Sequence, residues 1–263
     1  MANELELKSE GSLAPVPLNL DDVAGDAALG GKIGLGDISI PFVSIIQSNS
    51  PQCNIDSPAY VPGATSGGIF VSVINKLYDG RGAGANIILC YYERSLIQWG
   101  DREKGQGGFF GSYDIDDPIK NTAIQDEKGR FVLPNGNYLQ DTSYNYVLIE
   151  SDGTWHQAVY PMKSTAMKVS RKLNSILATT YIPGTKQLAP RFLYKWNMKT
   201  IKEAKAQNVW SSPMFTMGEM CTLEQYNAAK NYAKIAATQV LRKAIVRGET
   251  TGGNTPIDDN VPF

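Results

Sequence analysis

The sequence predicts a mostly β protein of the α+β class, in which antiparallel strands form a small, partly open barrel and two helices are added to it. Two observations lead to this prediction. Runs rich in β-branched and aromatic residues, separated by glycine and proline turns, dominate the stretch 38–162. The hydrophobic period then becomes helical over 163–178 and again over 222–248. A hydrophobic content of 42% is sufficient for a substantial core.

The first half of the chain supplies most of the predicted strands. They are "ISIPFVSIIQ" (38–47), "IFVSVIN" (69–75) and "ANIILCYYERSLIQW" (85–99). The run 100–118 is polar and rich in glycine, so we expect a long loop there. Residues 144–150 and 154–162 should form a hairpin, because "SDG" between them is typical of a turn.

The second half begins with a helix over 163–178, for which Ser164 is the expected N-cap. Residues 191–201 alternate as a strand does, and 208–217 predict another strand with an irregularity at Pro213. A helix over 222–248 should begin at Thr222 and end at Gly248. Its expected packing face consists of Leu223, Tyr226, Ala229, Ala233, Ala236, Val240 and Ala244. This order of elements favours the OB-fold, a five-stranded partly open barrel, and a β-sandwich is the alternative.

Three regions follow from composition. Residues 1–36 predict a flexible N-terminal arm, 37–248 the OB-like domain, and 249–263 a disordered acidic tail. No run of about 18 apolar residues is present, so we expect no transmembrane segment and no membrane partner. The polar, acidic N-terminus also lacks the apolar core of a signal peptide.

The net charge of −1 conceals a strong asymmetry along the chain. Residues 1–154 contain 10 basic and 20 acidic residues, whereas 155–247 contain 15 basic and three acidic ones. Residues 248–263 add three acidic residues and no basic one. A basic segment of this size indicates a polyanionic partner, and chance clustering on a solvated face is the alternative.

Signals for catalysis are weak. His156 is the single histidine and lies in a predicted strand, where a structural role is the simpler interpretation. "GRGAG" (80–84) precedes a strand and lacks the spacing of a phosphate-binding loop. No CxxC pair exists among Cys53, Cys90 and Cys221, so neither a disulfide nor a zinc site is indicated. We therefore expect a binding protein rather than an enzyme, with no cofactor and no metal.

Aromatic and basic residues interleave in the way that single-stranded nucleic acid binding requires. Cations follow the backbone phosphates, and aromatic rings stack on bases of any sequence. The alternative for each ring is a place in the barrel core. The candidate DNA-binding residues are Tyr91, Tyr92, Arg94, Trp99, Phe109, Phe110, Trp155, Lys163, Lys168, Arg171, Lys172, Arg191, Tyr194, Lys195, Trp196 and Lys199. Lys168, Arg171 and Lys172, with Lys195 and Lys199, should line the strand path, and Trp196 or Trp155 should stack on a base.

The C-terminal motif "DDNVPF" resembles the "DDDIPF" end of bacterial single-stranded DNA-binding proteins. The matching residues are Asp258, Asp259, Val261, Pro262 and Phe263, with Asn260 in place of the third aspartate. The resemblance implies a tail that recruits replication or recombination proteins, such as a polymerase, helicase, nuclease or RNA polymerase. Because the tail is acidic, we also expect it to compete with the strand for the basic surface.

The stretches "IPFVSIIQSNSPQ" (40–52), "YYERSLIQWGDRE…GGFFG" (91–111) and "YPMKSTAMKVSRKLNSI" (160–176) resemble a family of bacteriophage single-stranded DNA-binding proteins. This resemblance implies a phage-encoded protein in the host cytoplasm, an OB-fold core and a role in DNA replication, recombination or repair. The bacterial tetramer is not implied, because the chain is longer and has a large C-terminal helix, and a homodimer is an option. A single-strand annealing protein and a transcription activator that contacts RNA polymerase are the alternative functions.

Overall fold

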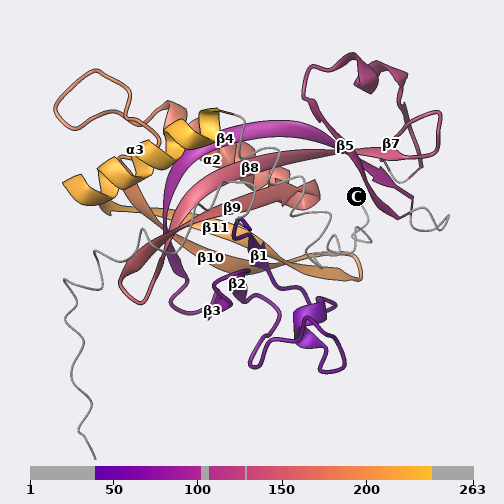
Figure 1. Ribbon diagram of the computed structural model, residues 1–263, viewed down its shortest axis with the longest axis horizontal. Coiled ribbons are helices and arrows are strands. Elements are labelled where there is room, and N and C mark those ends of the chain that lie inside the picture. Colours follow the sequence, from indigo (N-terminus) through magenta and orange to yellow (C-terminus); the bar gives the residue numbers. More distant parts are fainter. Residues whose placement is uncertain (1–38, 102–106, 128, 239–263) are drawn as a thin grey trace, which may run out of the picture.

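Antiparallel strands form most of the protein in the computed structural model, which describes residues 39–101, 107–127 and 129–238 (Figure 1). The strands are β1 (Val43–Ile45), β2 (Ile69–Val71), β3 (Lys76–Tyr78), β4 (Ala85–Gly100), β5 (Gly108–Asp114), β6 (Ile124–Gln125), β7 (Phe131–Val132), β8 (Tyr138–Ser151), β9 (Thr154–Lys163), β10 (Tyr194–Lys205) and β11 (Asn208–Met220). The helices are α2 (Met167–Ala178) and α3 (Leu223–Ala237), with short 3-10 turns η3 (Pro51–Cys53), η5 (Pro118–Thr122) and η6 (Ser164–Ala166). No helix within these ranges is long and apolar enough to cross a membrane.

One curled sheet forms the barrel. Its strand order is β11-β10-β4-β8, and β9 pairs with β8. The segment that leads into β1 joins β9 through a parallel bridge between Phe42 and Val159. The gap from β1 to β11 is spanned by the Gln47 amide, which donates to the Ser211 carbonyl at 2.9 Å and accepts from the Ser211 N–H at 2.8 Å. A side chain thus replaces a backbone ladder at the seam, and the barrel is partly open, as the OB-like prediction requires.

Strand alternation separates two cores on the two faces of this sheet. Val147 and Ile149 of β8 belong to the barrel interior, together with Leu173 of α2. Tyr146 and Leu148 belong instead to a second core on the outer face. A β-bulge lies between Leu89 and Tyr91 of β4, so the side of the sheet that even-numbered residues occupy changes there.

Helix α3 covers the outer face of the barrel (Figure 1). Ala229 and Ala236 are fully buried against β4 and β8, because their small side chains let the helix approach closely. Tyr232 lies between them, and its hydroxyl donates to the Ala158 carbonyl at 3.2 Å. The predicted packing face missed Tyr232 and wrongly included Leu223, whose exposed fraction is 77%.

The predicted start of α3 is confirmed. Thr222 accepts a hydrogen bond from the Gln225 N–H at 3.3 Å, and the Gln225 side chain accepts from the Thr222 N–H at 2.9 Å. This reciprocal capping box satisfies two backbone donors that the helix cannot. Gly248, the predicted end, lies outside the described residues.

Thr222→Ala is expected to lower the free energy of unfolding by about 1 kcal/mol, because one N-terminal N–H loses its acceptor. Chemical denaturation of the full chain measures this loss. Thr222→Ser, which keeps the capping hydroxyl, is the control. Equal midpoints for the two variants would show that the cap contributes nothing.

Other predictions were confirmed or corrected. The β8–β9 hairpin is present, with positive φ angles of 52° at Asp152 and 79° at Gly153 in its turn. The expected loop 100–118 contains β5, because it pairs with distant residues of β4. Ser164 is not the N-cap of α2, which begins after the η6 turn with Ala166 in that position. Pro213 pairs in register with Thr200, and the irregularity lies instead at the start of β10.

Candidate nucleic-acid interface

Strand β4 extends well beyond the barrel and is paired unevenly (Figure 1). On one side, β8 pairs with it along almost its whole length. On the other side, β10 pairs only with Ala85–Ile88 and β5 only with Ser95–Gly100. In the described part of the chain, no strand pairs with residues 89–94 on that side. We call residues 89–94 the β4 gap and residues 91–100 the β4 arm.

Arg191 lies at the β4 gap. Its Nη1 donates to Asn174 Oδ1 of α2 and its Nη2 to Asn145 Oδ1 of β8, both at 2.8 Å. Its Cζ lies 5.2 Å from the centroid of the Tyr92 ring, in a cation–π contact. Burial lowers the pKa of Arg191 to about 10. The guanidinium therefore stays charged at pH 7, although a largely buried position stabilises the charge less than water does.

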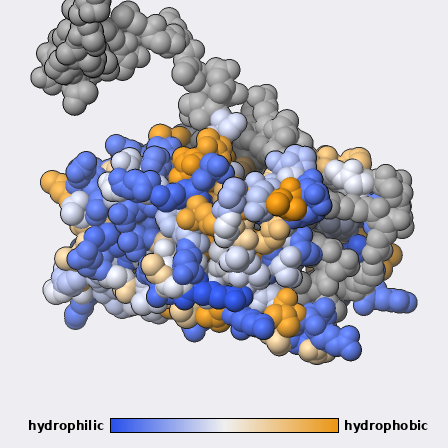
Figure 2. Space-filling view, turned by 90° about the horizontal axis from the view of Figure 1, so that it is seen from below, coloured by the Kyte–Doolittle hydropathy of each residue, from blue (hydrophilic) through white to orange (hydrophobic). Residues whose placement is uncertain are grey.

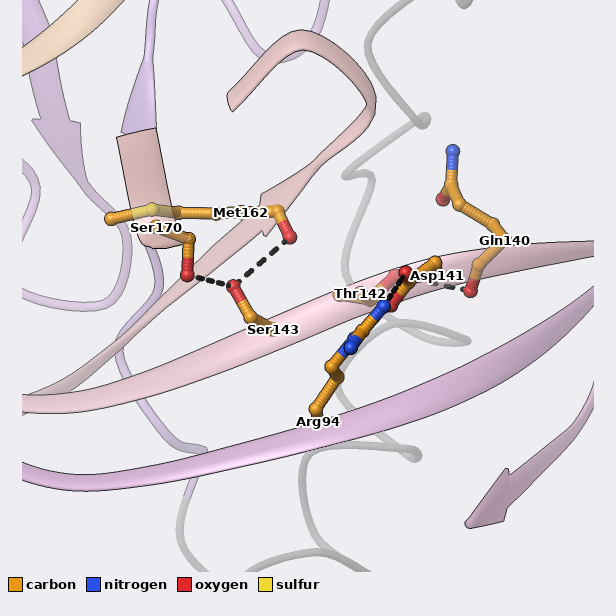
Figure 3. Close-up of polar contacts among 7 residues, drawn as sticks. All are labelled: Arg94, Gln140, Asp141, Thr142, Ser143, Met162 and Ser170. Carbon is orange, nitrogen blue, oxygen red and sulfur yellow. Dashed lines mark hydrogen bonds and ion pairs between the residues drawn. The ribbon is translucent and has the colours of Figure 1, made fainter. Parts of the chain in front are cut away.

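The position of Asn174 follows from how α2 is held. Ser170 of α2 and Ser143 of β8 share a hydrogen bond of 2.9 Å, and Ser143 Oγ also donates to the Met162 carbonyl at 3.4 Å (Figure 3). Both serines are buried, so their hydroxyls need these partners. Asn174 follows Ser170 by four residues and shares its helix face, which brings it over the sheet toward Arg191.

Arg94 is two residues beyond Tyr92 on the same face of β4, and it pairs with Asp141 of β8 (Figure 3). Its Nε donates to Asp141 Oδ1 at 2.7 Å, and its Nη2 donates to Oδ2. This bond to the carboxylate raises the pKa of Arg94. Arg94 is half-exposed, but its charge already has a carboxylate partner, unlike that of Arg191.

The outer face of the β4 arm carries a row of aromatic rings across three neighbouring strands. Trp99 pairs in register with Phe109 of β5 and Tyr138 of β8. Phe109 packs edge-on against Trp99 with ring centroids 5.9 Å apart. Lys163 of β9 places its ammonium 5.8 Å from the Trp99 ring. Trp99 itself is only 6% exposed, whereas the neighbouring Phe110 is 56% exposed.

Two residues of this surface were missed by the sequence analysis. Tyr138 lies beside Trp99, and the Arg130 guanidinium lies 5.3 Å from the Tyr138 ring. Arg130 also forms ion pairs with Asp126 at 2.8 Å and Asp101 at 3.7 Å. No signal in the sequence identifies Tyr138, because only the β4–β8 register brings it next to Trp99.

The cations predicted to line one path lie on two elements. Lys168, Arg171 and Lys172 are exposed on α2, and Lys168 pairs with Glu203 at 2.6 Å. Lys195 and Lys199 alternate with Trp196 and Met198 on β10, so they lie on the outer side of the barrel wall. Lys195 pairs with Glu219 at 2.5 Å. The single path through all five remains a prediction.

The burial of the other predicted rings decides which of them a base could reach. Trp196 is 2% exposed inside the barrel, which corrects the expectation that it stacks on a base. Tyr91 packs edge-on against Tyr146 with centroids 5.6 Å apart. Trp155 and Tyr194 are partly buried, so each keeps some accessible surface. Trp155 is therefore the better of the two tryptophans proposed for stacking.

The exposed surface is otherwise mixed. Figure 2 shows a largely hydrophilic face interrupted by several separate hydrophobic areas.

The predicted N-terminal arm (1–36) and the tail residues Asp258, Asp259, Val261, Pro262 and Phe263 lie outside the described residues.

Comparison with curated proteins and with solved structures found no match. A family model described as Pam3 phage gp34-like protein matches residues 8–241, which include every strand and helix of the structure. The chain therefore belongs to the Pam3 phage gp34-like family of phage proteins.

Proposed function

We propose that this protein binds single-stranded DNA with little sequence preference, in phage DNA replication, recombination or repair. One observation carries the proposal: cations from the basic half of the chain lie over aromatic rings of β4. Arg191 lies over Tyr92 and Lys163 over Trp99, although β4 itself belongs to the acidic half. Phe109 of β5 pairs with Trp99 of β4. Tyr92 and Trp99 lie on opposite faces of β4, because the β4–β8 register runs without a break between them and they are an odd number of residues apart. Tyr92 and Phe109 are partly exposed and can meet a base, whereas Trp99 is buried and supports Phe109.

Physical chemistry links this arrangement to single strands rather than duplexes. An unpaired base exposes a π-face, and stacking on an aromatic side chain contributes roughly 1–3 kcal/mol per base. Cations beside the ring can contact the phosphates on either side of the stacked base, with release of counterions. A duplex hides its base faces and offers only phosphates to the same surface.

Electrophoretic mobility shifts test the proposal, with a single strand and the duplex of the same sequence at equal nucleotide concentration. The single strand should shift at protein concentrations at least tenfold lower, an estimate based on the loss of one to two stacking contacts in the duplex. Equal shifts would refute the preference that we propose.

The cations of α2 should contribute mainly through long-range and phosphate contacts. Arg171→Ala with Lys172→Ala is expected to weaken binding and to reduce the salt slope, d log K/d log [salt], by roughly 1.4, or 0.7 for each phosphate contact. The slope is measured by titration of a dT oligonucleotide at several salt concentrations. An unchanged slope would exclude these two residues from the strand path.

We further propose that the acidic tail recruits partner proteins and competes with the strand. Deletion of residues 258–263 should tighten single-strand binding several-fold at low salt, because screening weakens the competition at high salt. Phe263→Ala keeps both aspartates, so it should reduce partner binding and leave strand affinity unchanged. A deletion that changes neither quantity would rule out both roles.

A further inference from the structure

We propose that Arg191, Asn145, Asn174 and Tyr92 form a phosphate-binding site at the β4 gap, and that its ligand is one backbone phosphate of the bound strand. The assignment of the strand as the source rests on the proposed function. The existence of a phosphate site does not rest on the proposed function, because it follows from hydrogen-bond donors without acceptors and from a charge without a counterion.

Two buried hydrogen-bond donors at the β4 gap lack acceptors within the described ranges. Asn145 is fully buried, and its Oδ1 accepts from Arg191 Nη2 at 2.8 Å. A flipped amide would turn its NH2 group toward the guanidinium, so this bond fixes the orientation of the side chain. Neither Asn145 Nδ2 nor Arg191 Nε has a hydrogen-bond partner within the described ranges. Buried donors without acceptors are costly, and the two lie on adjoining side chains.

The charge of Arg191 also lacks an anionic partner among the described residues. Arg94, Arg130, Lys76, Lys168 and Lys195 each form an ion pair with a carboxylate. Arg191 forms none with any described residue, and its two hydrogen-bond acceptors are neutral amides. The charged or polar groups that influence its pKa most after burial are Tyr92 and Cys90, and burial raises the pKa of the Cys90 thiol. A positive charge in this setting lacks an anion.

Phosphate fits this set of groups better than a single carboxylate does. A guanidinium presents a planar fork of N–H donors that matches two phosphate oxygens, and the remaining oxygens can accept from an amide. The Tyr92 ring packs against the guanidinium and restricts its orientation. An adjacent base can stack on the same ring, close to the bound phosphate. Arg171 is exposed one turn before Asn174 on α2, where it can contact the next phosphate.

Asn174→Asp is the sharpest test. The substitution is isosteric and places a carboxylate within hydrogen-bonding distance of Arg191 Nη1, so it neutralises the guanidinium without removing it. Asn174 is half-exposed, and a new ion pair there should not unfold the protein. Asn54→Asp makes the same charge change at an exposed turn and is the matched control.

The first readout is thermal unfolding with inorganic phosphate, at constant ionic strength set with sodium chloride. Phosphate about tenfold above its Kd should raise the Tm of the wild type and of Asn54→Asp by about 3–6 °C. Asn174→Asp and Arg191→Met should show no such rise, and thymidine, which carries no phosphate, should have no effect on any of them. An equal rise in Asn174→Asp would overturn the site, whether or not the protein binds DNA.

The second readout identifies the source of the phosphate. Inorganic phosphate should compete with a dT oligonucleotide for the wild type, and Asn174→Asp should weaken oligonucleotide binding about 5- to 10-fold at low salt, as loss of one phosphate contact predicts. A Tm rise with phosphate but no competition would overturn the strand as ligand. Tight DNA binding that Asn174→Asp leaves unchanged, without a phosphate effect, would overturn this inference and leave the proposed function intact.

Discussion

Trp196→Ala is expected to lower the free energy of unfolding by about 3–5 kcal/mol, the largest effect of any single substitution considered for this protein. Trp196 is 2% exposed and lies in the barrel interior with Met198, Tyr160 and Leu173. Truncation to alanine removes the ring from the point where β10, β9 and α2 meet and leaves a cavity that the barrel wall cannot close. Denaturant unfolding followed by circular dichroism measures the loss.

Trp196→Phe is the matched control. The indole Nε1 has no hydrogen-bond partner among the residues that the structure describes, so phenylalanine loses contact area but no bond. It should therefore be much less destabilised, and quenching of the remaining tryptophan fluorescence by poly(dT) should persist. Loss of quenching in Trp196→Phe, together with full stability in Trp196→Ala, would show that Trp196 contacts the DNA. That result would contradict the packing described above.

Lys163→Met with Arg191→Met is expected to weaken single-strand binding by roughly 10- to 100-fold at low salt, since each lost phosphate contact costs close to an order of magnitude there. These two cations lie over the Trp99 and Tyr92 rings, and neither has a carboxylate partner within the described ranges. Methionine keeps an unbranched apolar stem of similar length, so the packing against the rings is largely retained. Fluorescence anisotropy with a labelled dT oligonucleotide measures the affinity.

The control for this pair is Lys230→Met with Lys234→Met, two exposed lysines on α3 that make the same change in net charge. This double variant should bind within a factor of about three of the wild type, because distant exposed charges act only through a screened field. Equal losses in the two double variants would mean that binding depends on net charge, and the β4 arm would have no special role.

Features that depend on neighbouring residues were predictable from the sequence. The turn between β8 and β9 and the Thr222 cap each depend on a few consecutive residues. The alternation of β10 also predicted correctly that Trp196 and Met198 share a face. The alternation could not show that this face is the barrel interior. Aromatic residues on one face of a strand can pack in a core or bind a ligand, and the sequence does not distinguish the two. That choice depends on β1, α2 and β9, which lie far away in the sequence.

The candidate site shows the same limit more strongly. The sequence singled out Tyr92 and Arg191 by residue type alone. Their contact depends on the end of the β10–β4 pairing at Ile88, which leaves the following residues of β4 unpaired on that side within the described ranges. Asn145 and Asn174 carry no sequence signal, since asparagines in a strand and a helix are ordinary. β5 was missed because its glycine-rich sequence has weak strand propensity, and it is stabilised by pairing with Ser95–Gly100 of β4.

The central claim is that single strands lie along the β4 arm. Ultraviolet crosslinking of a dT oligonucleotide to the full-length protein, followed by mass spectrometry of the adducts, tests it most directly. The account predicts adducts at Tyr92 and at Phe109 or Phe110, which are accessible rings on or beside the arm, and far fewer adducts with the duplex of the same length. Adducts confined to β10–β11 or α3, or equal yields with single strand and duplex, would contradict it.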